Sequence, residues 1–507
     1  MFNNLLLSVD AGTIDWSRAQ FALTAIYHWL FVPLTLGLAV IMGIVETKYY
    51  CTKDEFWKEA AKFWQKLFGV NFAMGVATGI ILEFEFGTNW SNYSWFVGDI
   101  FGAPLAVEGI VAFFMESTFV AVMFFGWKKV SAGFHLASTW LTGLGATISA
   151  WWILVANAWM QYPVGCEFNP DTMRNEMVSF AEVALSPFAV SKFCHTVTSS
   201  WIIGALFCVG VCCWYLMKKR HTKLAIESMK IGAGVGLVAA LLAGGTGHKS
   251  GMDVAKVQPM KLAAMEALYD GGNEVGLKII EGIEVPYGLS IMATNDPKGY
   301  VPGINDILNG YTDNDGNVEP SVDEKIERGR KAIEALADYR KAKLAGEESG
   351  QYLATLNENM KYFGYGYVKD KNDVVPPVAV NFWAFRVMVG VGCLFILFFA
   401  VILAVTYKWP KFLFGKRDIT ALPAWHYWLA ILLIPLGYIG SECGWLVAEF
   451  GRQPWTIQDM LPTWVAVSDL QSGSVMITFF LFLALFTTML AVEINILLKQ
   501  IKKGPEV

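Results

Sequence analysis

Long apolar runs alternate with short polar connections along the chain, and this alternation gives the first prediction about the fold. Each run exceeds the roughly 18 to 20 residues that a helix needs to cross the hydrocarbon core of a bilayer. The pattern therefore predicts an all-α polytopic membrane protein with nine transmembrane helices. The runs occupy residues 22–46, 64–87, 101–127, 134–159, 187–217, 225–247, 378–407, 424–449 and 473–499.

One long polar excursion interrupts this alternation between the sixth and the seventh run. We therefore divide the chain into transmembrane helices one to six (1–247), an excursion (248–377) and transmembrane helices seven to nine (378–507). The first part of the excursion, which includes VQPMKLAAMEALYD, mixes apolar and polar residues as a segment lying against a membrane does. A later part, DEKIERGRKAIEALADYRKAKLAGEE, is typical of a charged, solvated helix.

The Lys and Arg residues of the connections predict the orientation of the helices. Successive connections lie on alternate sides of the membrane. One side holds seventeen of these Lys and Arg residues, and the other holds only Arg18, Arg174 and Arg452. Because positive residues remain in the cytoplasm, we expect the N-terminus and the excursion outside and the C-terminus inside. The first residues lack a basic region followed by a long apolar one, so we expect no cleaved signal peptide.

Composition agrees with a membrane protein and excludes some functions. The chain is 55% hydrophobic and 16% charged, and its net charge of -5 without a basic tract argues against nucleic acid as a partner. Its eight Cys are scattered without a C-x-x-C pair, so we predict neither a zinc site nor a disulfide framework.

The third apolar run carries two carboxylates, Glu108 and Glu116. A charged side chain at the centre of a membrane costs about 2.5 to 3.5 kcal/mol on insertion scales, so two in one helix indicate a function. In a regular helix they would lie about 12 Å apart along the axis, which suits two stations of a proton route. The alternative is a pair of neutral acids hydrogen-bonded to neighbouring helices.

Two of the six His residues, His28 and His195, lie well inside apolar runs, where iron ligation is one way to satisfy an imidazole. Met388 has a similar expected depth, and a His/Met pair is a known heme ligand set. Arg386 could offset a heme propionate, or it could extend to the outer face. A lone Met is more often a core residue than a ligand.

Glu449 lies at the outer end of the eighth run, where the helix dipole disfavours a carboxylate. It should therefore be neutralised by a cation, a proton or a metal. Arg452 follows just beyond it and is, like Arg386, a candidate cofactor-binding residue. Five candidates on five helices thus map to the outer half of the membrane: His28, Glu108, His195, Met388 and Glu449.

Such a set suits either a heme redox enzyme or an ion-coupled transporter. A heme-copper oxidase would need more buried His, and a diheme cytochrome b would carry paired His on one helix. A transporter would show broken helices and a repeat, and the sequence indicates neither. These patterns favour the redox enzyme.

Several long motifs closely resemble subunit I of the cytochrome bd-type quinol oxidases. The resemblance extends from about residue 16 to about residue 490 and is weakest over 300–372, which stays unassigned. The motifs are ALTAIYHWLFVPLTLG, FGTNWSNYSWFVGDIFGAPLAVEG with FFMES, ILVANAWMQ, MVSF with KFCHTV, KLAAMEA, FRVMV and GWLVAEFGRQPW.

The resemblance implies three hemes near the outer face. By position, His195 and Met388 would ligate a low-spin heme b. His28 and Glu449 would each ligate one of two high-spin hemes, a heme b and the chlorin heme d, in an order that the resemblance leaves open. Trp445 is similar to an aromatic residue that the family places between hemes.

The resemblance also implies a reaction and partners. Lys261 and Glu266 would bind the quinol; because five residues separate them on a helix, either the loop bends or the quinol bridges them. Oxygen would be reduced to water with cytoplasmic protons passing Glu116 and Glu108, which separates charge without pumping. A second large membrane subunit and small single-span subunits would complete the enzyme in the bacterial inner membrane. The alternatives are a proton-coupled transporter without a cofactor and a relative with b hemes only.

Overall fold

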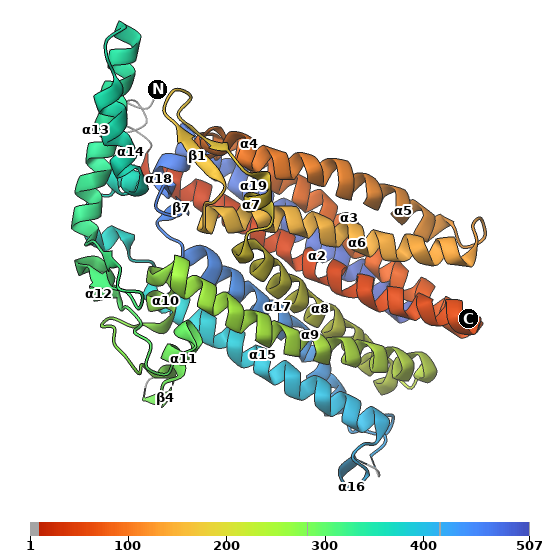
Figure 1. Cartoon of the computed structure of the whole chain (residues 1–507). Coiled ribbons are helices and arrows are strands. Elements are labelled where there is room, and N and C mark those ends of the chain that lie inside the picture. The colour runs from red at the N-terminus through yellow and green to blue at the C-terminus, as the bar shows by residue number, and fades with distance from the viewer. Residues whose placement is uncertain (1–9, 281, 415–416, 506–507) are drawn as a thin grey trace.

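The computed structural model describes residues 10–280, 282–414 and 417–505. Within these ranges nine membrane-length helices lie side by side in one bundle (Figure 1), which confirms the predicted fold class. The helices are α2 (Ala11–Thr52), α3 (Glu55–Thr88), α4 (Ser91–Val107) continued by η1 (Glu108–Phe113) and α5 (Phe114–Phe125), α6 (Ala132–Gln161), α8 (Pro187–Met217), α9 (Thr222–Val257), α15 (Val378–Tyr407), α17 (Ala424–Phe450) and α19 (Ser472–Lys503).

Several helices extend beyond the apolar runs that predicted them. The first run lies inside α2, which continues to Thr52 and ends where Lys53 adopts a left-handed conformation. Apolar runs mark only the part of a helix that crosses hydrocarbon, whereas helical hydrogen bonding continues into the headgroup region until a cap ends it. The N-terminal segment on which the signal-peptide expectation depends, and Lys416 of the charge count, lie outside the described residues.

The third span is not a regular helix, although the sequence indicates no broken helix. Gly98 interrupts α4 with a φ of 45° and a ψ of -114°, and residues Glu108–Phe113 form a π-helix. Glycine tolerates a positive φ because it has no Cβ. A π-helical turn has no apolar period of its own, so the hydrophobic pattern could not reveal it.

Helices α2 and α8 form the centre of the bundle and cross with their backbones almost in contact. A Cβ atom placed on Gly37 would lie 2.6 Å from the Cα atom of Gly204. Small residues allow such close packing, on which helix association in membranes depends. Helix α8 is largely buried, whereas α15 and α19 are mostly exposed.

Four helices form a closed ring. Helix α8 packs against α9 and α17, and α15 packs against the same two helices (Figure 1). Helices α8 and α15 therefore lie diagonally across the ring.

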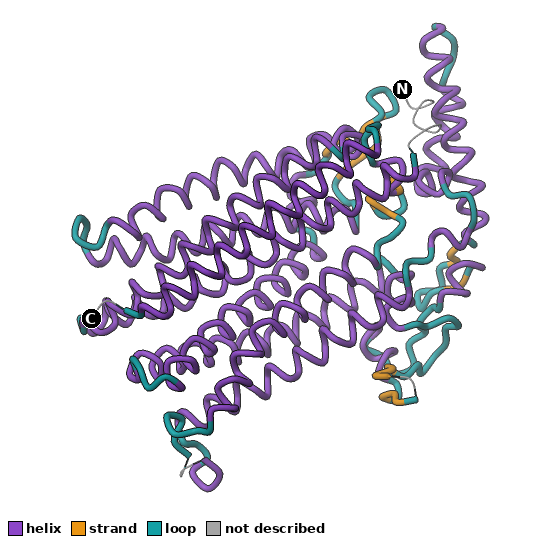
Figure 2. The backbone as a smooth tube through the Cα atoms, turned by 180° about the vertical axis from the view of Figure 1, so that it is seen from behind, coloured by secondary structure: helices purple, strands orange, loops and turns teal. Residues whose placement is uncertain are grey.

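The segment between α9 and α15 gathers at one end of the bundle, as both tube and cartoon views show (Figures 1 and 2). Helix α13 buries one face that includes Ile326, Leu336 and Tyr339, so it is less solvated than its charge pattern predicts. The helices of this segment are α10 (Pro259–Glu266), α11 (Gly288–Thr294), α12 (Ile304–Asn309), α13 (Val322–Ala345), α14 (Gly350–Asn359), η2 (Met360–Tyr367) and η3 (Lys371–Val374).

The described strands form four two-stranded antiparallel hairpins. They pair β1 (Cys166–Asn169) with β2 (Arg174–Met177), β3 (Leu277–Ile280) with β4 (Ile283–Val285), β5 (Tyr311–Thr312) with β6 (Val318–Glu319) and β7 (Trp455–Ile457) with β8 (Leu461–Pro462). Three further short helices lie outside the membrane-length helices and the segment between α9 and α15: α7 (Phe180–Ala184), α16 (Lys411–Phe414) and α18 (Thr463–Ala466).

Candidate functional site

The imidazoles of His28 and His195 are held in the same way by a neighbouring helix. The Nδ1 atom of His28 lies 3.0 Å from the hydroxyl of Thr78, and that of His195 lies 3.2 Å from the hydroxyl of Thr246. Each Thr hydroxyl already donates its proton to the carbonyl four residues back in its own helix. It can therefore only accept from the imidazole.

This arrangement favours the same tautomer, with the hydrogen on Nδ1, in both rings. With Nδ1 as the donor, the Nε2 atom of each neutral imidazole keeps a lone pair, which is the form that binds a metal ion. Glycines leave room beside both rings, since a Cβ atom on Gly79 or Gly247 would come within 3.1 and 3.2 Å of the Cε1 atom of His28 and His195, respectively.

Residues 441–449 of α17 connect the candidates from four helices. The Trp445 ring meets the Trp29 ring of α2 edge-on at 5.2 Å, and the ammonium of Lys192 on α8 lies 5.7 Å from its centre. A Cβ atom on Gly444 would lie 3.1 Å from the sulfur of Met388 on α15. Trp445 thus contacts Trp29, the residue after His28, and Lys192, three residues before His195, while its neighbour Gly444 packs against Met388.

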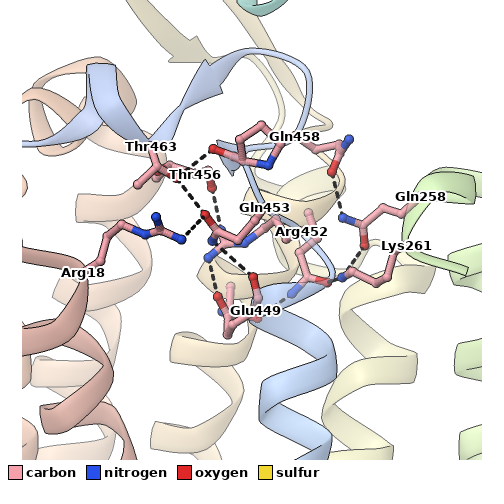
Figure 3. Close-up of polar contacts among 12 residues, drawn as sticks. Arg18, Gln258, Lys261, Glu449, Arg452, Gln453, Thr456, Gln458 and Thr463 are labelled. Carbon is pink, nitrogen blue, oxygen red and sulfur yellow. Dashed lines mark hydrogen bonds and ion pairs between the residues drawn. The ribbon is translucent and has the colours of Figure 1, made fainter. Parts of the chain in front are cut away.

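Glu449 is the centre of a polar network at the end of α17 (Figure 3). One carboxylate oxygen accepts a hydrogen bond of 3.0 Å from the amide of Asn157, and the other forms an ion pair with Arg452. Arg452 therefore provides a cation that neutralises Glu449. A carboxylate has about four lone-pair directions, so these contacts leave capacity for a further electrophile.

Lys261 lies in the same network and is almost fully buried (3% exposed). Its ammonium donates hydrogen bonds of 2.8 Å to the side-chain oxygens of Gln161 and Gln258 (Figure 3). Burial lowers the pKa of Lys261 well below its usual value, and the charges of Lys192 and Arg452 act in the same direction. The site therefore favours a neutral amine or an added anion.

Glu266 lies at the other end of α10 and belongs to a different set of contacts. Its carboxylate accepts a hydrogen bond of 2.6 Å from Arg386, whose guanidinium also donates to the carbonyls of Met265 and Lys278. Burial raises the pKa of Glu266 to about 7, against the opposing effect of Arg386. Helix α10 contains both Lys261 and Glu266 without a break, and residues five apart on a helix do not share a face. The two side chains therefore have separate partners.

Glu108 and Glu116 both lie against α6. The hydroxyl of Ser149 donates a hydrogen bond of 2.5 Å to Glu108, and a Cβ atom on Gly145 would lie 2.6 Å from the Cγ atom of Glu116. Ser149 and Gly145 are about 6 Å apart along α6. This distance is shorter than the roughly 12 Å expected between Glu108 and Glu116 along a regular helix. A third carboxylate, Glu83, is near enough to interact electrostatically with Glu108.

Sequence reasoning missed two kinds of residue. Lys192 is an ionisable residue inside an apolar run, three positions before His195, and this signal could have identified it. Thr78 and Thr246 carry no such signal, because Thr is common in membrane helices and hydrogen-bonds its own backbone.

Comparisons with known proteins identify the family of this chain. Residues 16–505 match the sequence profile of the family described as cytochrome bd terminal oxidase subunit I. The chain is 39% identical to cytochrome bd-II ubiquinol oxidase subunit 1 of Escherichia coli, with 97% of each chain covered. It is 34% identical to cytochrome bd ubiquinol oxidase subunit 1 of Bacillus subtilis, over 97% of this chain and 94% of the relative.

A solved structure shows the same fold. The bd oxidase from Geobacillus thermodenitrificans aligns with a TM-score of 0.76 at 22% identity, covering 97% of this chain and 99% of that one. The family profile and the full-length relatives confirm the resemblance that the motifs indicated. This chain therefore belongs to the family of cytochrome bd terminal oxidase subunits I.

Proposed function

We propose that this chain oxidises a membrane quinol at the external end of the bundle and reduces oxygen to water. As a family member it is a heme-containing terminal oxidase subunit of the inner membrane. The observation that carries the proposal is the shared setting of His28 and His195. In each imidazole Nδ1 is hydrogen-bonded to a Thr hydroxyl, and Nε2 has no hydrogen-bond partner among the described residues. This is the state in which a heme iron is bound.

The residues fit the expected hemes. His195 and Met388 lie on helices that face each other across the ring, and they would hold one low-spin heme b. His28 and Glu449 would each hold one high-spin heme, a heme b or heme d, and Trp445 would lie between cofactors. When bound, these hemes supply the one-electron and oxygen chemistry.

The quinol would bind around α10. Glu266, next to Arg386, would accept a proton from a quinol hydroxyl, since a base with a pKa near the working pH is most effective. Lys261 donates to Gln161 and Gln258 instead, so a quinol that contacts both Lys261 and Glu266 must bridge the two ends of the helix. Protons released here would leave on the external side.

Protons for oxygen reduction would come from the opposite side of the membrane. Glu116 and Glu108 both contact α6 and would pass them toward the outer half of the bundle. Electrons and protons thus arrive from opposite sides, which separates charge without pumping. The predicted orientation, with the C-terminus in the cytoplasm, is part of this proposal.

We also propose that the chain works with partners. The apolar outward faces of α15 and α19 suit a second large membrane subunit, small single-span subunits and lipid. The quinol and oxygen are the substrates.

A reduced-minus-oxidised visible spectrum of the chain, purified with its natural partners, tests the proposal. We expect b-heme bands and a red-shifted chlorin band. A colourless complex would instead favour a proton-coupled transporter, which the intramembrane carboxylates alone could also serve. Bands of b hemes without the chlorin would indicate the relative that carries only b hemes.

A further inference from the structure

A second buried ionisable pair, His135 and Glu46, lies at the end of the bundle opposite the candidate site. The Nδ1 atom of His135 is 2.7 Å from one oxygen of Glu46, and its Nε2 atom is 3.0 Å from the carbonyl of Met123. The other oxygen of Glu46 accepts hydrogen bonds of 2.8 Å from Gln65 and 2.6 Å from Thr139. The four side chains are at most 2% exposed.

This geometry places one proton where the two side chains of the pair can share it. The carbonyl of Met123 can only accept, so Nε2 must carry a hydrogen. One further proton lies between Nδ1 and the carboxylate, and either atom can own it without the loss of a hydrogen bond.

Within residues 10–280, 282–414 and 417–505, the ion pair with Glu46 is the one that involves His135. The ring of Trp127 stacks over His135 at 3.9 Å, and its indole N–H donates to Gln65. The ammonium of Lys62 on α3 lies 5.7 Å from the centre of the Trp127 ring and pairs with Glu59. The shared proton is therefore not pinned by a direct salt bridge to a cation.

A polar stripe leads from this pair to the carboxylates of the proposed proton route. Its residues recur at the three- and four-residue spacing that places side chains on one helix face. Thr142 is fully buried, Gly145 is the position against which Glu116 packs, and Ser149 donates to Glu108. The stripe on α6 consists of His135, Ser138, Thr139, Thr142, Gly145 and Ser149.

We infer that the His135–Glu46 pair is a proton-relay station that feeds Glu116 along this face of α6. The inference rests on the proposed function, in which Glu116 and Glu108 conduct protons. One proton enters the pair from the cytoplasmic end and one leaves toward Thr142, with water molecules bridging the hydroxyls. The pair returns to its starting state, and no electron moves.

Thr142→Val tests the route without disturbing the pair. It removes a buried hydroxyl at nearly constant volume, and Thr147→Val is the matched control because Thr147 makes the same bond to the carbonyl four residues back, on another face of α6. In the purified complex given an oxygen pulse, we expect Thr142→Val to slow proton uptake about tenfold or more. Heme spectra and the KM for quinol should not change, and Thr147→Val should behave as wild type.

Glu46→Gln is the second variant, since it preserves the shape but removes the site of proton exchange. It should slow uptake as Thr142→Val does. Equal, wild-type rates in Thr142→Val and Thr147→Val would overturn the inference, even if Glu46→Gln failed to assemble. Glu108→Gln separates the two proposals. If Glu108→Gln slows proton uptake while Thr142→Val does not, only the inferred relay from His135 and Glu46 along α6 is wrong. If Glu108→Gln has no effect, the proposed proton route through Glu116 and Glu108 itself fails.

Discussion

Threonine hydroxyls decide which nitrogen each buried imidazole offers. At His195 the hydroxyl of Thr246 accepts from Nδ1, and at His28 the hydroxyl of Thr78 does the same. Partners of this kind orient a ligand and raise its basicity, and their loss typically costs about 10- to 100-fold in metal affinity.

Thr246→Val should therefore weaken heme retention by about 10- to 100-fold while the helix persists, because Val keeps the volume and removes the acceptor. Heme content per protein after extensive washing measures this. Thr488→Val on α19, whose hydroxyl only bonds its own helix, is the control. Full retention in Thr246→Val would show that the hydroxyl does not position His195.

Met388→Leu should change the low-spin heme and little else. Leu preserves the volume, so we expect a loss of stability below about 1.5 kcal/mol. Thioether ligation raises the heme potential, so its loss should lower the midpoint by on the order of 100 mV within the ~0.8 V that axial ligands span. Redox titration of the reduced band measures this, with Met476→Leu on α19 as the control. An unchanged band and midpoint would remove Met388 from the ligand set.

Glu266 should give the enzyme a pH dependence on the quinol side. Its pKa is raised to about 7 by burial, and only the ionised carboxylate can accept a proton. Quinol oxidation should therefore fall about tenfold per pH unit below pH 7 and level off above it. Glu266→Gln should be slow and lose this limb, whereas Glu284→Gln, an exposed carboxylate of the same segment, should keep it. A retained limb in Glu266→Gln would assign the titration elsewhere.

At the scale of elements, an irregular helix positions the carboxylates of the third span. The π-helix Glu108–Phe113 adds about one residue to a turn, which changes the rotation between Glu108 and Glu116. As a result both face α6 through Ser149 and Gly145. Such π segments are frequent at functional sites, and here the segment begins with a carboxylate of the proposed proton route.

Glu108→Gln should reduce oxygen-reduction turnover by about 100-fold, since it removes a group that transfers protons. The amide can still accept from Ser149, so the low-spin heme spectrum should persist. Steady-state oxygen consumption and the reduced spectrum are the two measurements. Glu55→Gln, an exposed carboxylate at the start of α3, should leave both unchanged. Full turnover in Glu108→Gln would exclude it from the path.

At the scale of the whole molecule, the polar elements between α9 and α15 cover one end of the bundle, and the Glu449 network lies beneath them (Figures 1 and 3). The opposite end carries the exposed Cys51 and the positive connections. In the proposed function, quinol oxidation would take place on one side of the membrane and proton entry on the other.

Labelling of intact cells or sealed vesicles tests that orientation. A membrane-impermeant maleimide should label Glu334→Cys on exposed α13 from the external side, in a background where Cys51 is Ser. In the unmodified chain, Cys51 should react only after the membrane is opened. The reverse pattern would invert the orientation and the proposed proton route with it.

The sequence by itself determined the bundle of membrane-spanning helices, because the length of an apolar run sets whether a helix can cross the hydrocarbon core. The asymmetry of Lys and Arg likewise predicts an orientation from the sequence alone. Its motifs also indicated the family, which the comparisons confirm, and made His28, His195, Met388 and Glu449 the candidate ligands. Only the tertiary structure decided which helices face one another. Three features depend on contacts between residues distant in sequence, for which no local period exists. They are the Thr78 and Thr246 hydroxyls beside the imidazoles, the separate partners of Lys261 and Glu266, and the buried His135–Glu46 pair.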